Sequence, residues 1–103
     1  MTDPAKTVPS LDDLRARRDE ILELARRHRA YNVRVFGSVA RGDATPESDI
    51  DVLVAFRPGA SLFDLSALWQ DLQDLLDREV NVVSEGGMNE RFRQRIADDV
   101  VPL

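Results

Sequence analysis

Two aspartates at the start of an apolar run are the residues of this sequence whose spacing best suits chemistry. Asp49 and Asp51 flank Ile50, and the apolar run continues to Phe56. Because alternate side chains of a β-strand lie on one face, the two carboxylates are predicted to point the same way, with Cα atoms roughly 6.6 Å apart. Mg²⁺ binds one or two such carboxylates and completes its coordination with water and substrate phosphate oxygens. The pair therefore predicts a magnesium site for a phosphorylated substrate.

A glycine–serine pair, which ends eleven positions before the first aspartate, offers the other half of such a site. Gly37 and Ser38 follow a short β-type run, and glycine lets a ligand approach the backbone closely. Ser38 is predicted to N-cap a short helix that Gly42 ends. Unpaired N–H groups at a helix N-terminus suit phosphate. The sequence thus predicts a nucleotide held by metal on one side and by backbone N–H groups on the other.

The simpler interpretation is a Gly-Ser turn with no functional connection to a strand that carries two exposed aspartates. Residue frequencies alone would produce this spacing in roughly one chain per thousand of this size. The context, however, is the one that the chemistry requires: strand, turn, helical turn, polar loop and strand. We therefore adopt the functional interpretation.

The stretch from Gly37 to Val54 reads G-S-V-A-R-G-D-A-T-P-E-S-D-I-D-V-L-V. It resembles the signature of the minimal nucleotidyltransferase (MNT) domains of the DNA polymerase β-like superfamily. The similarity covers the chain from Tyr31 to Leu103, including the final I-A-D-D-V-V-P-L. Many members of this family are antitoxins encoded beside a HEPN-domain toxin, and some transfer AMP onto that toxin.

The resemblance implies a role for each motif residue. It implies that Gly37 and Ser38 bind the nucleotide phosphates and that Asp49 and Asp51 are catalytic metal ligands. It also implies a third carboxylate on the next strand, where this chain has Asn81 within V-N-V-V. Asn81 is therefore a degenerate third catalytic position, and it predicts weak activity.

An acidic residue two positions earlier is the nearest substitute for the missing carboxylate. Glu79 is predicted to lie on the same strand face as Asn81, closer to the strand's end. It could replace the third carboxylate only in part.

The elements predicted around these motifs follow the order αβαβαβα, a mixed α/β (α+β) class. We expect helices at 10–30, 38–41, 61–77 and 89–98, and strands at 32–36, 49–57 and 79–84. The second and third strands are joined by a helix and should be parallel, whereas the first two should be antiparallel. The prediction is a three-stranded mixed sheet with helices packed on it, nucleotidyltransferase-like. Residues 1–9 are expected to form a flexible arm and 10–103 a single domain.

Several other side chains have competing interpretations. Trp69 and Phe63 could border the nucleotide, but apolar residues at helical spacing usually form core. His28, the only histidine, is expected to be a surface residue or a partner of a helix C-terminal dipole. The basic residues of the last helix either offset neighbouring acids or contact a phosphate; these are Arg91, Arg93 and Arg95.

Composition restricts the location and partners of the protein. The chain is 43% apolar and 32% charged, without cysteine and without an apolar run as long as a membrane span. Net charge is −5, with +3 in residues 1–42 and −8 in residues 43–103. An acidic second half argues against broad nucleic-acid binding, which needs a basic face. We expect a cytoplasmic protein with no direct DNA or RNA binding, no membrane contact and no signal peptide.

Two functional classes remain open at this point. The first is an Mg²⁺-dependent enzyme that transfers a nucleoside monophosphate, by resemblance AMP from ATP, to a hydroxyl of a protein such as a HEPN toxin. The second is a catalytically inactive antitoxin, a binding module that neutralises its partner by direct contact. Pyrophosphate release and a modified partner distinguish the first class from the second.

Overall fold

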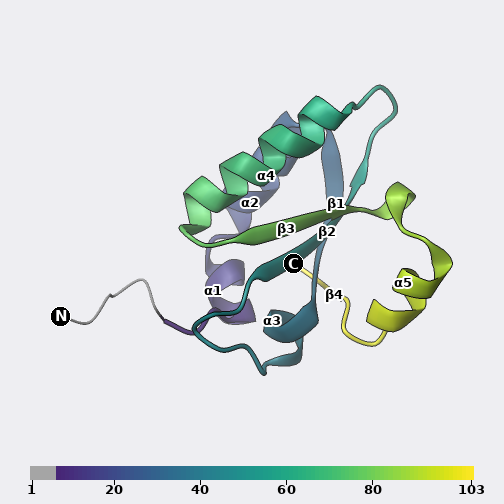
Figure 1. Ribbon diagram of the computed structural model, residues 1–103. Coiled ribbons are helices and arrows are strands. Elements are labelled where there is room, and N and C mark those ends of the chain that lie inside the picture. Colours follow the sequence, from purple (N-terminus) through teal and green to yellow (C-terminus); the bar gives the residue numbers. More distant parts are fainter. Residues whose placement is uncertain (1–6) are drawn as a thin grey trace.

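The sheet is mixed, with the strand order β3-β2-β1-β4 among residues 7–103, the part of the chain that this computed structural model describes (Figure 1). Strand β1 runs antiparallel to both β2 and β4, whereas β2 and β3 are parallel. The strands are β1 (Ala30–Phe36), β2 (Ile50–Phe56), β3 (Val80–Ser84) and β4 (Val101–Pro102). The strand directions predicted for the first three are confirmed.

The fourth strand is a correction to the predicted three-stranded sheet. Val101 pairs with Val35, and Pro102 pairs with Arg34. The Leu103 N–H extends this contact by donating to the Val33 carbonyl at 3.1 Å. A strand of two residues, one of them proline, shows no alternation, so its pairing depends on contact with a segment distant in sequence.

The helices follow the predicted order, with one break. They are α1 (Leu11–Ala16), α2 (Arg18–Arg27), α3 (Gly37–Arg41), α4 (Leu62–Leu76) and α5 (Glu90–Ile96), with the 3₁₀ turn η1 (Glu85–Gly87) after β3. The single helix predicted for 10–30 is wrong, because the chain leaves helical geometry at Arg17 (φ −111°, ψ 22°). The Arg17 guanidinium donates to the Leu75 carbonyl of α4 at 2.7 Å, a contact that no local pattern reveals.

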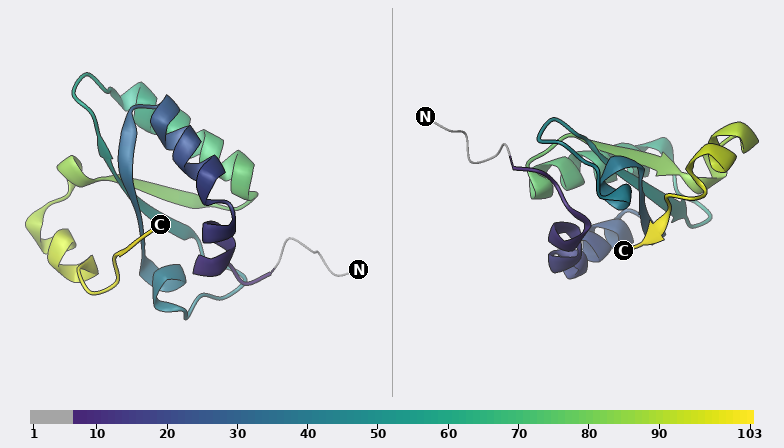
Figure 2. Two further views of the ribbon diagram at one scale, coloured as in Figure 1. Left: turned by 180° about the vertical axis from the view of Figure 1, so that it is seen from behind. Right: turned by 90° about the horizontal axis from the view of Figure 1, so that it is seen from below.

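Each face of the sheet carries its own apolar cluster. The larger cluster joins α1, α2 and α4 to the sheet residues Val35, Val52 and Val54. The smaller one joins Phe36 and Leu53 to the C-terminal segment. Figure 2 shows α5 away from the side of the sheet on which α1 and α2 lie. Because only the short C-terminal elements cover this second face, its part nearest β3 stays open.

Helix α4 begins as predicted but buries fewer of its apolar residues than expected. Ser61 and Asp64 form the capping box. Leu68 is fully buried, yet Leu62 and Phe63 are 81% and 86% exposed, so the prediction that Phe63 packs in the core is wrong. At about 100° per residue these two lie roughly 120–140° around the helix from Leu68, which places them off its buried face.

The remaining expectations concern the N-terminal arm and the histidine. Residues 1–6 of the predicted arm lie outside the described residues; of the rest, Pro9 is buried and the Thr7 carbonyl accepts from Arg78. His28 caps α2, and its Nε2 lies 2.7 Å from Asp71 of α4, so it joins two helices. Within residues 7–103, no helix is long and apolar enough to cross a membrane.

Candidate active site

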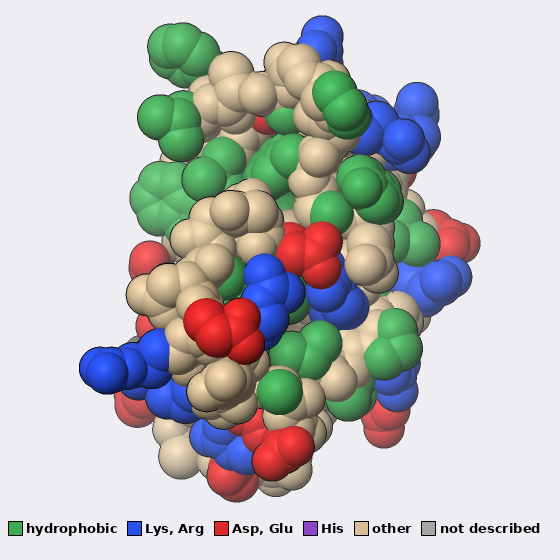
Figure 3. All heavy atoms as spheres, turned by 90° about the vertical axis from the view of Figure 1, so that its right-hand side faces the viewer, with side chains coloured by type: hydrophobic (Ala, Val, Ile, Leu, Met, Phe, Trp, Pro, Cys, Tyr) green, Lys and Arg blue, Asp and Glu red, His purple; other side chains and the backbone are tan. Residues whose placement is uncertain are grey.

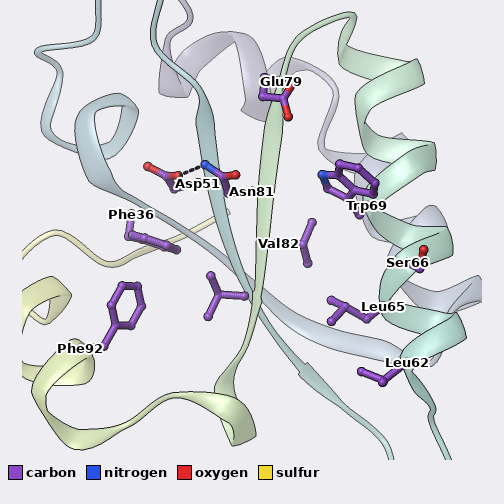
Figure 4. Close-up of a pocket in the computed structure, with 11 residues that line it drawn as sticks. Phe36, Asp51, Leu62, Leu65, Ser66, Trp69, Glu79, Asn81, Val82 and Phe92 are labelled. Carbon is purple, nitrogen blue, oxygen red and sulfur yellow. Dashed lines mark hydrogen bonds between the residues drawn. The ribbon is translucent and has the colours of Figure 1, made fainter.

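Asp51 occupies the centre of the candidate site because β2 lies between β1 and β3. Its neighbours across the sheet are Phe36 on β1 and Asn81 on β3. The Asn81 side chain donates from Nδ2 to Asp51 Oδ1 at 3.0 Å (Figure 4). Asp51 is half-buried and Asn81 is exposed. Position 81, where the resemblance implies a third carboxylate, is therefore in direct contact with Asp51.

Gly37 closes the other side of the Asp51 carboxylate. A Cβ atom at position 37 would lie 2.2 Å from Asp51 Oδ2, far inside van der Waals contact. Gly37 also has φ +76°, a backbone conformation that other residues rarely adopt. The two oxygens of Asp51 are thus shared between strands: Oδ2 lies against the Gly37 backbone of the β1 side, and Oδ1 against Asn81 of β3.

Replacing Gly37 with alanine is expected to destabilise the protein and to displace Asp51. Gly42→Ala is the matched control, because Gly42 has φ +83° but a Cβ atom added there would have no neighbour within 4 Å. The control should cost about 1–2 kcal/mol, the penalty of a left-handed backbone, and Gly37→Ala should cost clearly more, since its methyl group also overlaps a carboxylate. Urea unfolding measures both. Equal losses would contradict the close approach.

The short helix after Gly37 is built differently from the prediction. Its N-cap is Phe36, and no side chain caps it, so the N-cap predicted for Ser38 is wrong. The Ser38 carbonyl instead accepts from the N–H groups of Gly42 and Asp43. Gly42 ends the helix in the left-handed conformation, as predicted. The Ser38 hydroxyl is therefore not committed to capping.

Arg41, at the end of α3, is held by acids. Its guanidinium contacts Asp43 Oδ2 at 3.1 Å and Asp99 Oδ2 at 2.9 Å. These hydrogen bonds, that to Asp43 first, raise the pKa of Arg41 above its ordinary value. The pairs tie the loop after α3 to the C-terminal segment.

Asp49 lies just outside β2, which begins at Ile50. It is exposed and lines a hollow of about 190 Å³ that also includes Asp77 and Arg78. Asp51 lines a larger pocket, and Glu79 lines both. Glu79 therefore lines both the hollow beside Asp49 and the pocket beside Asp51. It forms no ion pair with any of residues 7–103.

The larger pocket, of about 780 Å³, extends from Asp51 across β3 to α4. In Figure 4, Phe36 and Phe92 lie on the Asp51 side of β3, and side chains of α4 lie on the other. Trp69 is 38% exposed in this pocket, and its Nε1 donates to the Val80 carbonyl at 2.6 Å. The α4 wall consists of Leu62, Leu65, Ser66 and Trp69. Sequence reasoning named Trp69 as a possible border of the nucleotide but favoured core packing for it, and it missed the other three. The sequence indicated such a wall through the apolar residues of α4 that do not lie on its buried face.

The donor set can hold a hard cation. Asp49, Asp51 and the Asn81 amide provide oxygen ligands only, which suits Mg²⁺ when substrate phosphates complete the coordination. The lack of a side chain at Gly37 lets Asp51 Oδ2 lie against the backbone of the turn, where the Cβ atom of any other residue would overlap it. Residues 7–103 contain no group of three or more acids, histidines or cysteines placed to bind metal. A site here would therefore depend on the phosphates of its substrate.

Two of the three basic residues of α5 make local contacts. Arg93 lies 3.8 Å from Glu90, and Arg95 stacks over the Phe92 ring at 5.3 Å. The Phe92 ring in turn meets Phe36 edge-on, with centroids 5.9 Å apart. For Arg93, offsetting neighbouring acids is the interpretation that these contacts favour.

Comparison with known proteins identifies the family. The nucleotidyltransferase domain model matches residues 18–101. A Methanocaldococcus jannaschii protein, named provisionally as a protein adenylyltransferase, is 34% identical over 82% of this chain and 90% of its own length. A solved structure described provisionally as a minimal nucleotidyltransferase is 48% identical, with a TM-score of 0.80 over 91% of this chain and 96% of its own. A mutant structure of the MntA toxin–antitoxin pair is 25% identical, with a TM-score of 0.69 over 84% and 70% of the two chains. The chain, in which the Gly-Ser turn lies beside Asp51 of a mixed sheet, belongs to the nucleotidyltransferase domain family.

Proposed function

We propose that this nucleotidyltransferase transfers AMP from ATP to a hydroxyl group of a partner protein. The observation that carries the proposal is the position of Asp51, whose carboxylate lies between the Gly37 backbone and the Asn81 side chain. A nucleotide phosphate bound at the Gly37–Ser38 turn would meet Asp51 on one side, and an attacking group would approach from β3 on the other. The name of the relative from M. jannaschii supports a protein acceptor.

Each site residue has a separate role in this proposal. The N–H groups of the Gly37–Ser38 turn bind the nucleotide phosphates, and Asp49 and Asp51 bind Mg²⁺. When bound, Mg²⁺ neutralises the charge that develops on the phosphates. The acceptor oxygen forms a bond to the α-phosphorus, the bond from that phosphorus to the bridging oxygen breaks, and pyrophosphate leaves. The hydroxyl proton passes to water, because the neutral Asn81 amide cannot accept it.

The partner in this proposal is a toxin of the HEPN class encoded beside this chain. The similarity to the MntA toxin–antitoxin structure supports it. The acceptor protein itself would then complete the open side of the site.

Neutralisation by contact alone is the second candidate. The observation that favours it is Asn81, which places a neutral amide beside Asp51 where the resemblance implies a carboxylate. In this case the protein would bind its partner and leave it unmodified.

Mass spectrometry of the adjacent gene's product distinguishes the two candidates. The product is incubated with this protein, ATP and Mg²⁺, and its intact mass is measured. An added AMP, with release of one pyrophosphate for each, supports the transferase. A stable complex with an unmodified partner supports contact alone, and recovery of no complex and no modification rejects both.

A further inference from the structure

The free edge of β3 continues the candidate active site into a second groove. Strand β3 is at the edge of the sheet, with β2 on its other side. The pocket that contains Asp51 also contains Val82 of β3 and Leu62 and Leu65 of α4. A neighbouring hollow of about 300 Å³ shares the same two leucines and reaches Ser84 at the end of the strand. Together they follow β3 along most of its length, with α4 as a wall.

The backbone of β3 has hydrogen-bonding groups available along this edge. The Glu79 carbonyl accepts from Ile50 of β2, so residues 79, 81 and 83 direct their backbone groups toward β2. Val80 faces the opposite way, and α4 uses both of its groups: Gln73 accepts from its N–H, and Trp69 donates to its carbonyl. By the same alternation, Val82 presents its N–H and C=O groups to the groove, and Ser84 presents its N–H. The Ser84 carbonyl belongs to the N-cap of the turn η1. An unpaired edge of this kind is a template for another strand.

The wall beside this edge is apolar and exposed. Leu62 is 81% exposed at the start of α4, and Trp69, about two turns farther along on nearly the same face, is 38% exposed. Figure 3 shows hydrophobic side chains gathered around a hollow in the upper part of the molecule. The carboxylates of Asp51 and Glu79 line the same pocket, and no lysine or arginine among residues 7–103 lines it. Its occupant should therefore be apolar along α4, without an acidic group near Asp51.

The direction of the proposed reaction determines which substrate reaches this edge. Nucleotidyl transfer is an in-line displacement, so the attacking and leaving oxygens lie on opposite sides of the phosphorus. The phosphates are assigned to the Gly37–Ser38 turn, on the β1 side of Asp51. Pyrophosphate therefore leaves on the β1 side, and the acceptor hydroxyl arrives from the side of Asn81 and β3.

We infer that the acceptor protein binds as an extended segment that pairs with the free edge of β3. This inference rests on the proposed function and specifies its acceptor site. Because side chains of a strand alternate between faces, the residue carrying the hydroxyl lies on the Asn81 face. Its two neighbours then lie against the Leu62, Leu65 and Trp69 wall. The acceptor segment thus has apolar residues on both sides of the modified one.

Two adjacent, equally exposed residues provide a matched test of the groove. Leu62 lines both hollows, whereas Phe63 lines neither. Both are in the first turn of α4, where a glutamate is favourable for the helix, so Leu62→Glu and Phe63→Glu should fold equally well. Transfer of label from α-³²P-ATP to the adjacent gene's product is measured at varied acceptor concentration. We expect Leu62→Glu to raise the acceptor KM at least about tenfold, as expected for an unpaired charge at an apolar contact, with MgATP affinity unchanged and Phe63→Glu like wild type.

The outcomes separate this inference from the proposed function. If wild type transfers no label, the proposed function fails and the acceptor site fails with it. If wild type transfers label and the two variants have equal acceptor KM values, the groove is not the acceptor site. If sedimentation shows a dimer that Leu62→Glu converts to a monomer, a second copy of this chain occupies the groove and the inference is overturned.

Amide hydrogen exchange tests the strand pairing directly. On addition of the acceptor, the Val82 and Ser84 amides should exchange at least about tenfold more slowly, since unpaired edge amides become hydrogen-bonded. The Asn81 and Val83 amides, already directed toward β2, should change little. Protection confined to other elements, or equal on all four amides, would reject pairing along this edge.

Discussion

Replacing Asp51 with asparagine is expected to reduce AMP transfer at least about a hundredfold. Charge stabilisation by a bound metal is worth several kcal/mol of the barrier, and each 1.36 kcal/mol is a factor of ten in rate. Asp51 lies between the Gly37 backbone and Asn81, so the substitution removes the negative charge at the centre of the site. The variant should also bind MgATP more weakly, because one charge opposite the cation is lost.

Calorimetry with MgATP and labelled transfer to the partner measure these two effects. Asp12→Asn is the control: it removes the same charge from an exposed position of α1, outside the Asp51 pocket. It should leave both quantities unchanged. Equal MgATP affinity in wild type and Asp51→Asn would reject the metal role of Asp51.

The second large effect is a gain. Asn81→Asp is expected to raise the transfer rate at least about tenfold, because general-base assistance is typically worth ~10²–10⁴-fold. The position is suitable, since Asn81 already contacts Asp51 Oδ1 at 3.0 Å and is exposed in the same pocket. MgATP affinity should change little, because the phosphate side of the site is untouched. A wild type that is already fast, with no gain in the variant, would point to Glu79 as the third group.

The same substitution has a consequence for stability that does not depend on activity. The hydrogen bond from Asn81 becomes a contact between two carboxylates, which repel each other and cannot both ionise easily. Asn81→Asp should therefore lower Tm in the absence of Mg²⁺ and recover much of that loss when Mg²⁺ is added.

Asn89→Asp is the matched control for the Tm measurement. It introduces the same charge at the N-cap of α5, where aspartate and asparagine are equally favourable. Its Tm should not depend on Mg²⁺. A Tm of Asn81→Asp that Mg²⁺ does not change would reject a cation between positions 51 and 81.

Local patterns determined most of the elements and their order. The apolar run from Val52 to Phe56 predicts a buried strand, and the capping box at Ser61 and Asp64 predicts the start of α4. The helix between two such strands predicts their parallel pairing, because parallel strands need a crossover. These features depend on residues near one another in sequence, where propensity and periodicity act.

The residues of the candidate site were identifiable from sequence, but their contacts were not. Gly37, Asp51 and Asn81 come from three strands or turns, and the register of those strands decides that they meet. A shift of one residue in that register would turn Asn81 to the other face. The sequence also placed Asp49 beside Asp51 by alternation, whereas the strand begins one residue later, at Ile50.

Only the tertiary structure decided the break at Arg17, the strand β4 and the exposure of Leu62 and Phe63. Each depends on a distant partner or on the lack of one: Arg17 binds the carbonyl of Leu75, and β4 pairs with β1. The sheet ends at β3, so the start of α4 has no further strand to cover. The sequence by itself therefore determined the elements and the chemistry of the motif residues. Packing between segments distant in sequence decided how these residues meet and which apolar surface stays open.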